Sequence, residues 1–205
     1  MSLLIILRNK RYPNYFQKLM LDAIDSHIAD NIILCSGFFQ ENSFSASFST
    51  GLAKLLKKNN IAVTTIGVYN PIWKPQYIIF RDNLIACGIS VNAKLTASYK
   101  WHAKIFILKK GEEPIFGIIG SSNMTSRAFG VCKQFNFEAD VVLWDNKYPE
   151  LENLTSKSSE FLSGENNIND LIYADYDVEK NNQISIVERL KQLEKELDIE
   201  NLRDL

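Results

Sequence analysis

This chain of 205 residues is poor in the residues that build metal sites and disulfide frameworks. Its two histidines, His27 and His102, lie far apart and belong to no metal-binding motif such as HExxH. The three cysteines are Cys35, Cys87 and Cys132. Their odd number and wide spacing fit neither a disulfide framework nor a CxxC metal site, so we expect core thiols in a reducing compartment. The sequence therefore predicts no metal site.

Long apolar runs are missing as well. No stretch approaches the ~18–20 residues that a membrane-spanning helix needs. The apolar start, residues 1–7, is too short for a signal sequence and has neither a basic beginning nor a small-residue cleavage site. These absences predict a cytoplasmic protein without a membrane partner.

Net charge is small, but the charges are unevenly distributed along the chain. The formal net charge is −1. Residues 1–93 carry a balance of +4, residues 94–133 carry +5, and residues 134–205 carry −10. A basic surface attracts polyanions such as nucleic acid, because phosphate contacts dominate that affinity. The alternative is that the charges are scattered over solvated faces.

Strand-like and helix-like runs alternate along roughly the first 95 residues, which is typical of an α/β fold, and three successive strand-like runs follow from Trp101. The strand-like runs cover residues 2–7, 32–35, 61–68, 89–95, 101–108, 115–119 and 137–144. The helix-like runs cover residues 16–28, 52–58, 77–87 and 184–197. We predict a layered sandwich with a mixed, largely parallel β-sheet flanked by helices over residues 1–150. Residues 151–205 are predicted to form an acidic helical extension packed on or beside it.

The chemistry-bearing residues lie in the later strands. His102 and Lys104 stand two apart at the head of an apolar run, so both side chains face the same side of a strand. A turn with the sequence Gly-Ser-Ser-Asn follows at residues 120–123, and Asn136-x-Glu138 precedes another apolar run. A proton carrier beside a fixed cation suits chemistry on a phosphate ester.

These pieces resemble the phospholipase D superfamily, whose signature is HxK(x)4D(x)6GSxN with an acidic residue on the next strand. The resemblance covers roughly residues 100–145 and implies the fold predicted above. Two departures stand out: the family aspartate falls at Lys109, and the gap from His102 to Gly120 is four residues longer. The turn at residues 111–114 can absorb such an insertion between two strands.

The resemblance implies a role for each matching residue. His102 would attack phosphorus or protonate the leaving oxygen, since imidazole can do either near neutral pH. Lys104 and Asn123 would bind the non-bridging oxygens and stabilise the developing charge. Ser121 would add a hydroxyl hydrogen bond, and Glu138 would orient His102. The family forms a covalent phosphohistidine and uses no metal or other cofactor.

Such chemistry needs two histidines, one to attack and one to protonate. His27 falls within the first predicted helix and has no lysine at the matching offset, so we expect a structural position for it. A chain with one motif can supply the second histidine by two-fold dimerisation, which brings identical residues together near the axis. We predict a homodimer with one composite active site.

Three further residues are predicted to bind substrate. Lys100 and Trp101 lead directly into the motif strand, and Ser122 lies in the Gly-Ser-Ser-Asn turn. Aromatic side chains near strand ends can stack on bases, although such residues are more often core. The other candidates for stacking are Tyr99, Tyr69, Trp73 and the pair Phe38-Phe39.

The sequence as a whole predicts a metal-independent phosphodiesterase that cleaves nucleic acid, with DNA favoured over RNA. Two alternatives stay open at this point: a catalytically weak or inactive nucleic-acid-binding module, and a phospholipid hydrolase. A chain this short has little room for a separate specificity domain, so a helicase or specificity subunit is a candidate partner.

Overall fold

One nine-stranded sheet organises the computed structural model, which describes residues 2–8, 15–68, 70–96, 102–134, 136–154 and 171–205. The strands are β1 (Ser2–Arg8), β2 (Asn31–Ser36), β3 (Ala62–Val68), β4 (Val91–Thr96), β5 (Lys104–Lys110), β6 (Glu113–Gly120), β7 (Glu138–Trp144), β8 (Leu171–Asp175) and β9 (Arg203–Asp204). The helices are α1 (Tyr15–Ile24), α2 (Leu52–Lys58), α3 (Lys74–Ala86), α5 (Ile186–Leu197) and the 3₁₀ turn η1 (Ile199–Asn201). No helix in these ranges is both long and apolar enough to cross a membrane.

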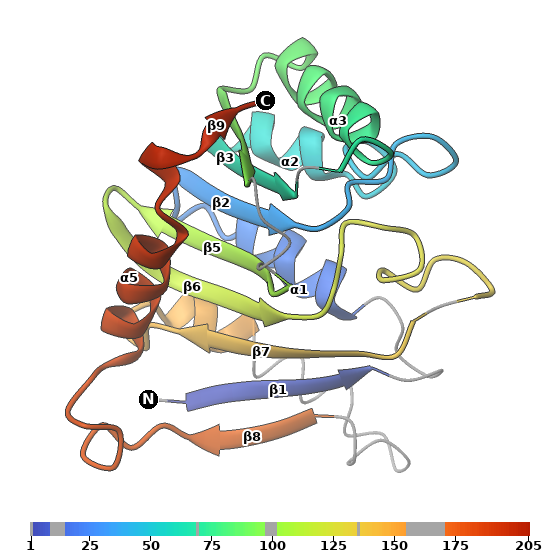
Figure 1. Cartoon of the computed structure of the whole chain (residues 1–205). Coiled ribbons are helices and arrows are strands. Elements are labelled where there is room, and N and C mark those ends of the chain that lie inside the picture. The colour runs from blue at the N-terminus through green and yellow to red at the C-terminus, as the bar shows by residue number, and fades with distance from the viewer. Residues whose placement is uncertain (1, 9–14, 69, 97–101, 135, 155–170) are drawn as a thin grey trace.

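The strand order is β8-β1-β7-β6-β5-β2-β3-β4-β9 (Figure 1). The predicted α/β fold with a mixed sheet flanked by helices is confirmed, but the expectation of a largely parallel sheet is wrong. Six of the eight strand pairs are antiparallel, and only β2–β3 and β3–β4 are parallel. Parallel neighbours need a crossover, which α2 and α3 provide, whereas a tight turn through Gly111 (φ +56°) makes β5 and β6 antiparallel.

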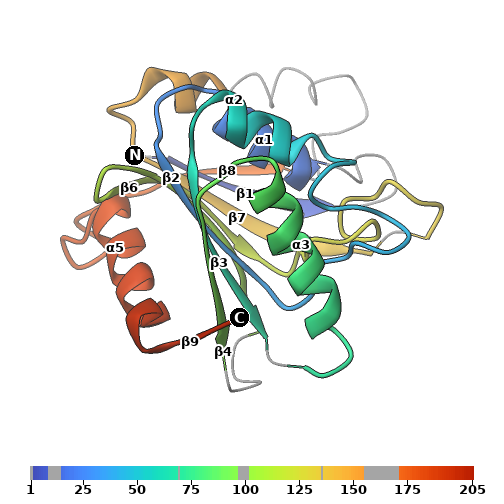
Figure 2. The ribbon, with the colours of Figure 1, turned by 90° about the horizontal axis from the view of Figure 1, so that it is seen from above.

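Helices cover both faces of the sheet (Figure 2). α1, α2 and α3 lie on one face and α5 lies on the other. Alternation along β5 shows the division, because Phe106 and Leu108 belong to the larger core and Ile105 and Ile107 to the core beneath α5. Lys104 has the parity of Phe106, so it points toward the face that carries α1 to α3.

The segment after residue 170 completes the sheet. The sequence predicted an acidic helical extension over residues 151–205, and the described part of it contains the helix α5, which has a capping box between Ser185 and Glu188 at its start and carries as many basic as acidic residues. The structure adds β8 and β9, which form the two edges of the sheet. β8 was not foreseen because five residues with a short apolar run carry little periodic signal.

α5 approaches the sheet closely. A Cβ at Gly117 of β6 would lie 2.5 Å from Leu190 Cδ2, so any other residue here would displace the Leu190 side chain or shift the helix. On the same face, the Nζ of the buried Lys109 lies 2.6 Å from Glu194 Oε1. An apolar contact and an ion pair therefore fix α5 against β5 and β6.

Candidate active site

Strand register places the motif residues side by side. Lys104 of β5 pairs with Gly120 of β6, and Gly120 pairs with Asp140 of β7. A Cβ at Gly120 would lie 2.1 Å from Asp140 Oδ1, well inside any tolerated contact. The glycine of the Gly-Ser-Ser-Asn turn is therefore required because the Asp140 carboxylate occupies the space above it.

Asp140 is a site residue that the sequence analysis missed. Its side chain is 1% exposed, and its two carboxylate oxygens accept the Ser122 hydroxyl at 2.8 and 2.6 Å. A buried carboxylate must be hydrogen-bonded to be tolerated, and this one holds the turn that carries Asn123. An acidic residue at an inward position of the apolar strand β7 was the available signal.

Asn123 is oriented by the end of β2. Its Oδ1 accepts the main-chain N–H of Phe38 at 3.1 Å and the Ser36 hydroxyl at 3.3 Å. A Cβ at Gly37 would lie 3.2 Å from the same oxygen, so the chain passes very close here. With the oxygen engaged, the amide orientation is set and Nδ2 is the remaining donor, which makes no hydrogen bond to any of the described residues.

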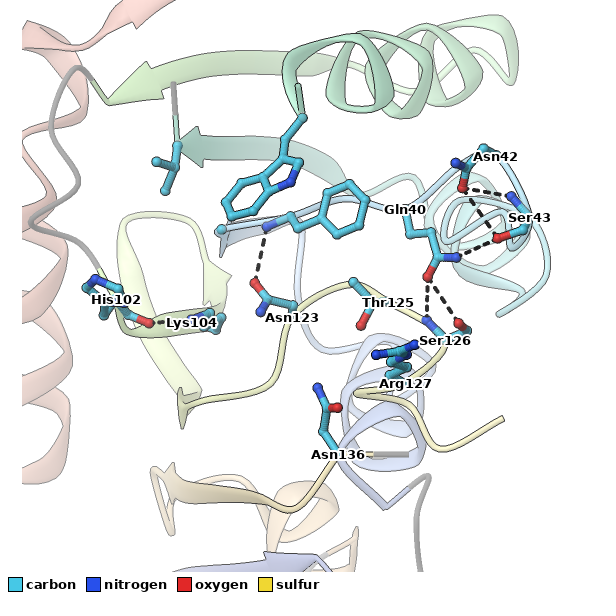
Figure 3. A pocket seen from close by; sticks show the side chains of 14 residues that line it. Gln40, Asn42, Ser43, His102, Lys104, Asn123, Thr125, Ser126, Arg127 and Asn136 are labelled. Atoms are coloured by element: carbon cyan, nitrogen blue, oxygen red, sulfur yellow. Dashed lines mark hydrogen bonds between the residues drawn. The ribbon is translucent and has the colours of Figure 1, made fainter. Parts of the chain in front are cut away.

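Lys104 and His102 lie at the beginning of β5. The Lys104 ammonium donates to the main-chain oxygen of His102 at 2.6 Å, and the His102 side chain is exposed (Figure 3). Asn123 projects from the neighbouring turn toward the same space (Figure 3). His102, Lys104 and Asn123, the predicted reactive histidine and oxygen-binding groups, therefore share one cavity.

The cavity has a volume of about 520 Å³ and lies where β2, β3 and β6 end and β5 begins. Its lining residues are Gly37, Phe38, Gln40, Asn42, Ser43, Val68, Trp73, His102, Lys104, Asn123, Thr125, Ser126, Arg127 and Asn136. Two of them, Lys104 and Arg127, carry a permanent positive charge, and none carries a carboxylate. The cavity therefore favours an anionic group.

The wall formed by residues 40–43 and 123–127 is held by hydrogen bonds between two loops. The Gln40 side-chain oxygen accepts from the main-chain N–H and the hydroxyl of Ser126, at 3.0 and 3.1 Å. The Gln40 main-chain N–H donates to Met124 O at 3.0 Å. The sequence analysis missed Gln40 and Arg127, because loop residues show no periodicity that marks them.

Other predicted site residues lie outside this cavity. Ser121 donates its hydroxyl to Glu138, whose second oxygen accepts from Asn136 at 3.1 Å. Among the described residues no hydrogen bond joins Glu138 to His102, so the orienting role is not seen in this arrangement. Ser122 is buried on Asp140 instead of facing the cavity.

Lys100 and Trp101, predicted to bind substrate, fall outside the described residues, as do Tyr69 and Tyr99. In the part of the chain that is described, no group of three or more His, Cys, Asp or Glu residues could hold a metal ion. His27 lies beyond the end of α1, in a turn with φ +61°, and does not line the cavity. The expectation that His27 is part of the first helix is therefore wrong, while its position outside the cavity is as expected.

Lys109 occupies the position of the family aspartate. Its parity on β5 is opposite to that of Lys104, and its side chain is 7% exposed beneath α5. Its partners are Glu194 at 2.6 Å and Glu112 at 3.4 Å. The departure from the motif therefore lies on the other face of the sheet from the cavity.

The site and the sheet define a phosphodiesterase of the phospholipase D type, in which histidine, lysine and asparagine converge at one end of a mixed sheet. Residues 15–170 match the family described as the NgoFVII restriction endonuclease N-terminal PLD domain, and the chain belongs to that family. It is thereby a member of a family of phospholipase D-type endonucleases. No curated protein matches the sequence significantly.

Several solved structures resemble this one at low sequence identity. Nuc from Salmonella typhimurium, a phospholipase D family member, is 16% identical with a TM-score of 0.48, and the match covers 86% of this chain and 100% of that one. NucT from Helicobacter pylori is 15% identical with a TM-score of 0.45, over 78% and 93% of the two chains.

Proposed function

We propose that the chain cleaves phosphodiester bonds in nucleic acid without a metal ion, through a phosphohistidine at His102. The observation that carries this proposal is the cavity in which His102, Lys104 and Asn123 meet without a carboxylate. An anionic phosphodiester would enter it, and two fixed donors would contact the non-bridging oxygens. DNA is the favoured substrate, in keeping with the restriction endonuclease family to which the chain belongs.

The reaction has two displacements at phosphorus. In the first, an imidazole nitrogen of His102 forms a bond to phosphorus while the bond to the leaving oxygen breaks and that oxygen takes a proton from a second imidazole. In the second, water gives a proton to that second imidazole and attacks phosphorus, and the N–P bond breaks. Lys104 and Asn123 Nδ2 stabilise the negative charge that builds up on the oxygens in both steps.

The second imidazole is proposed to be His102 of a second copy of the chain. The chain has two histidines, and of these only His102 is among the described residues that line the cavity. A two-fold axis at the open side of the cavity would place two sets of His102, Lys104 and Asn123 around one phosphate. We place this reaction in the cytoplasm. A partner such as a helicase or a specificity subunit would supply the sequence preference.

A nuclease assay in EDTA tests the core of the proposal. We expect the protein to cut DNA in EDTA and the His102→Ala variant to lose cutting by at least about a thousandfold, since the nucleophile is gone. His27→Ala, the same substitution outside the cavity, should keep wild-type activity. An acid-labile, alkali-stable phosphoryl adduct should form on His102 during turnover. Cutting that needs an added divalent metal, or that survives His102→Ala, would refute the mechanism.

A further inference from the structure

Two aromatic side chains form one wall of the cavity. Phe38 and Trp73 both line it, with ring centroids 5.6 Å apart and ring planes inclined by 31°. Trp73 is 38% exposed. Phe39, the next residue along the chain, is buried and stacks on Tyr77 with centroids 4.6 Å apart. Phe39 therefore packs in the core, whereas the adjacent Phe38 lines the cavity.

The aromatic wall adjoins the proposed phosphate site. The main-chain N–H of Phe38 donates to Asn123 Oδ1 at 3.1 Å, so the residue that carries the ring also orients the carboxamide. Phe38 and Trp73 line the same cavity as Lys104 and Asn123, so one ligand in this cavity can contact both the donors and the rings. The wall is therefore placed to contact the part of the substrate next to the reacting phosphorus.

The charge of the cavity distinguishes between two kinds of ligand that aromatic rings bind. Aromatic rings bind both nucleobases, by stacking, and quaternary ammonium groups, by cation–π attraction. The lining residues include Lys104 and Arg127 and no carboxylate, so a cationic headgroup would be repelled. A neutral, flat nucleobase carries no such penalty.

We propose that Phe38 and Trp73 bind an unpaired nucleobase of the nucleotide next to the scissile phosphate. This inference rests on the proposed nuclease function and specifies that the substrate has an unpaired base beside the bond that is cut. In a duplex both faces of a base are covered by its neighbours, so an aromatic wall is useful only to a base that is single-stranded or turned out of the stack. A cavity of about 520 Å³ lies within the range of pockets that enclose small ligands.

Binding to two oligomers with equal phosphates tests the proposal. The full-length His102→Ala variant is titrated with oligothymidylate and with an abasic chain of the same length, by calorimetry, which needs no aromatic label. We expect oligothymidylate to bind about tenfold more tightly, the size of one base–aromatic contact. Adding Trp73→Ala should bring the ratio of the two affinities close to one, while Trp73→Phe should keep most of it.

Phe48→Ala is the matched control, because Phe48 is an exposed phenylalanine outside the cavity lining. It should leave the ratio unchanged. Equal binding of the two chains, or an unchanged ratio in Trp73→Ala, overturns the proposal even if the protein cuts DNA in EDTA. Base-dependent binding that needs Trp73, in a protein whose wild-type form cuts nothing, would refute the nuclease function and keep the base-binding wall.

Discussion

The ion pair between Lys109 and Glu194 allows a quantitative test of whether residue 109, which replaces the motif aspartate, contributes to stability or to activity. Lys109 replaces the aspartate of the family signature, and its ammonium lies 2.6 Å from Glu194 Oε1. The side chains are 7% and 22% exposed, so the pair lies between a buried and a surface ion pair. Lys109→Met removes the cation and leaves Glu194 half-enclosed beside an apolar side chain.

Breaking a buried pair costs about 3–5 kcal/mol, and an exposed pair contributes about 0–1 kcal/mol. The intermediate exposure of Lys109 and Glu194 predicts a loss of about 2 kcal/mol in the free energy of unfolding, or about 4–8 °C in Tm for a chain of this size. Urea unfolding followed by circular dichroism measures it. The double variant Lys109→Met/Glu194→Met should be more stable than Lys109→Met alone, because no unpaired charge remains.

Lys191→Met is the matched control, since its ammonium lies 3.4 Å from Glu113 in an exposed pair that also joins α5 to the sheet, at the neighbouring strand β6. It should cost less than about 0.5 kcal/mol. Below the unfolding transition, Lys109→Met should keep kcat/KM within about twofold, because Lys109 and the cavity lie on opposite faces of the sheet. Equal stability of the Lys109→Met and Lys191→Met variants, or loss of activity in folded Lys109→Met, would refute this reasoning.

Three further predictions concern the Gly-Ser-Ser-Asn turn, the proposed dimer and the cysteines. Gly120→Ala should lower the free energy of unfolding by about 1–3 kcal/mol and abolish cutting, because the new Cβ displaces the Asp140 carboxylate. Wild-type values in thermal melting and DNA cleavage would contradict the pairing of Gly120 with Asp140. If the active site is shared, co-refolding wild type with equal His102→Ala should leave about one quarter of the activity instead of about one half, since mixed dimers lack one imidazole. Burial raises the pKa of the Cys35 thiol to about 12, so at pH 8 a disulfide reagent should modify Cys87 and Cys132 but reach Cys35 only after unfolding.

The sequence predicted the elements whose own pattern is strong. β3 is rich in β-branched residues, and α2 and α5 show apolar residues at helical spacing, so local propensity and burial agree there. Strand direction was predicted poorly because an apolar run is equally compatible with parallel and antiparallel neighbours. The tight turn at Gly111 makes β5 and β6 antiparallel. A turn of that kind depends on a few neighbouring residues, so it can be used to predict strand direction from the sequence.

The site was predicted in part for a similar reason. His102 and Lys104 share a strand face by parity alone, which needs no knowledge of neighbours. Glu138 and Asp140 lie two residues apart on β7 and face the same side of that strand. Deciding which of them lies beside the Gly-Ser-Ser-Asn turn therefore needs the register of β6 and β7. Register places Asp140 beside Gly120, and the sequence carries no direct sign of that pairing.

The two faces of β5 divide the motif into parts with separate tasks. Even-numbered positions bring His102 and Lys104 to the cavity, and the same parity continues into the core at Phe106. Odd-numbered positions pack beneath α5, and there the charge at Lys109 is matched by Glu194. A change of charge at residue 109 can therefore be balanced on α5 without moving an atom in the cavity. The requirement at residue 109 of this chain is therefore a cation that pairs with Glu194 across the contact between the sheet and α5.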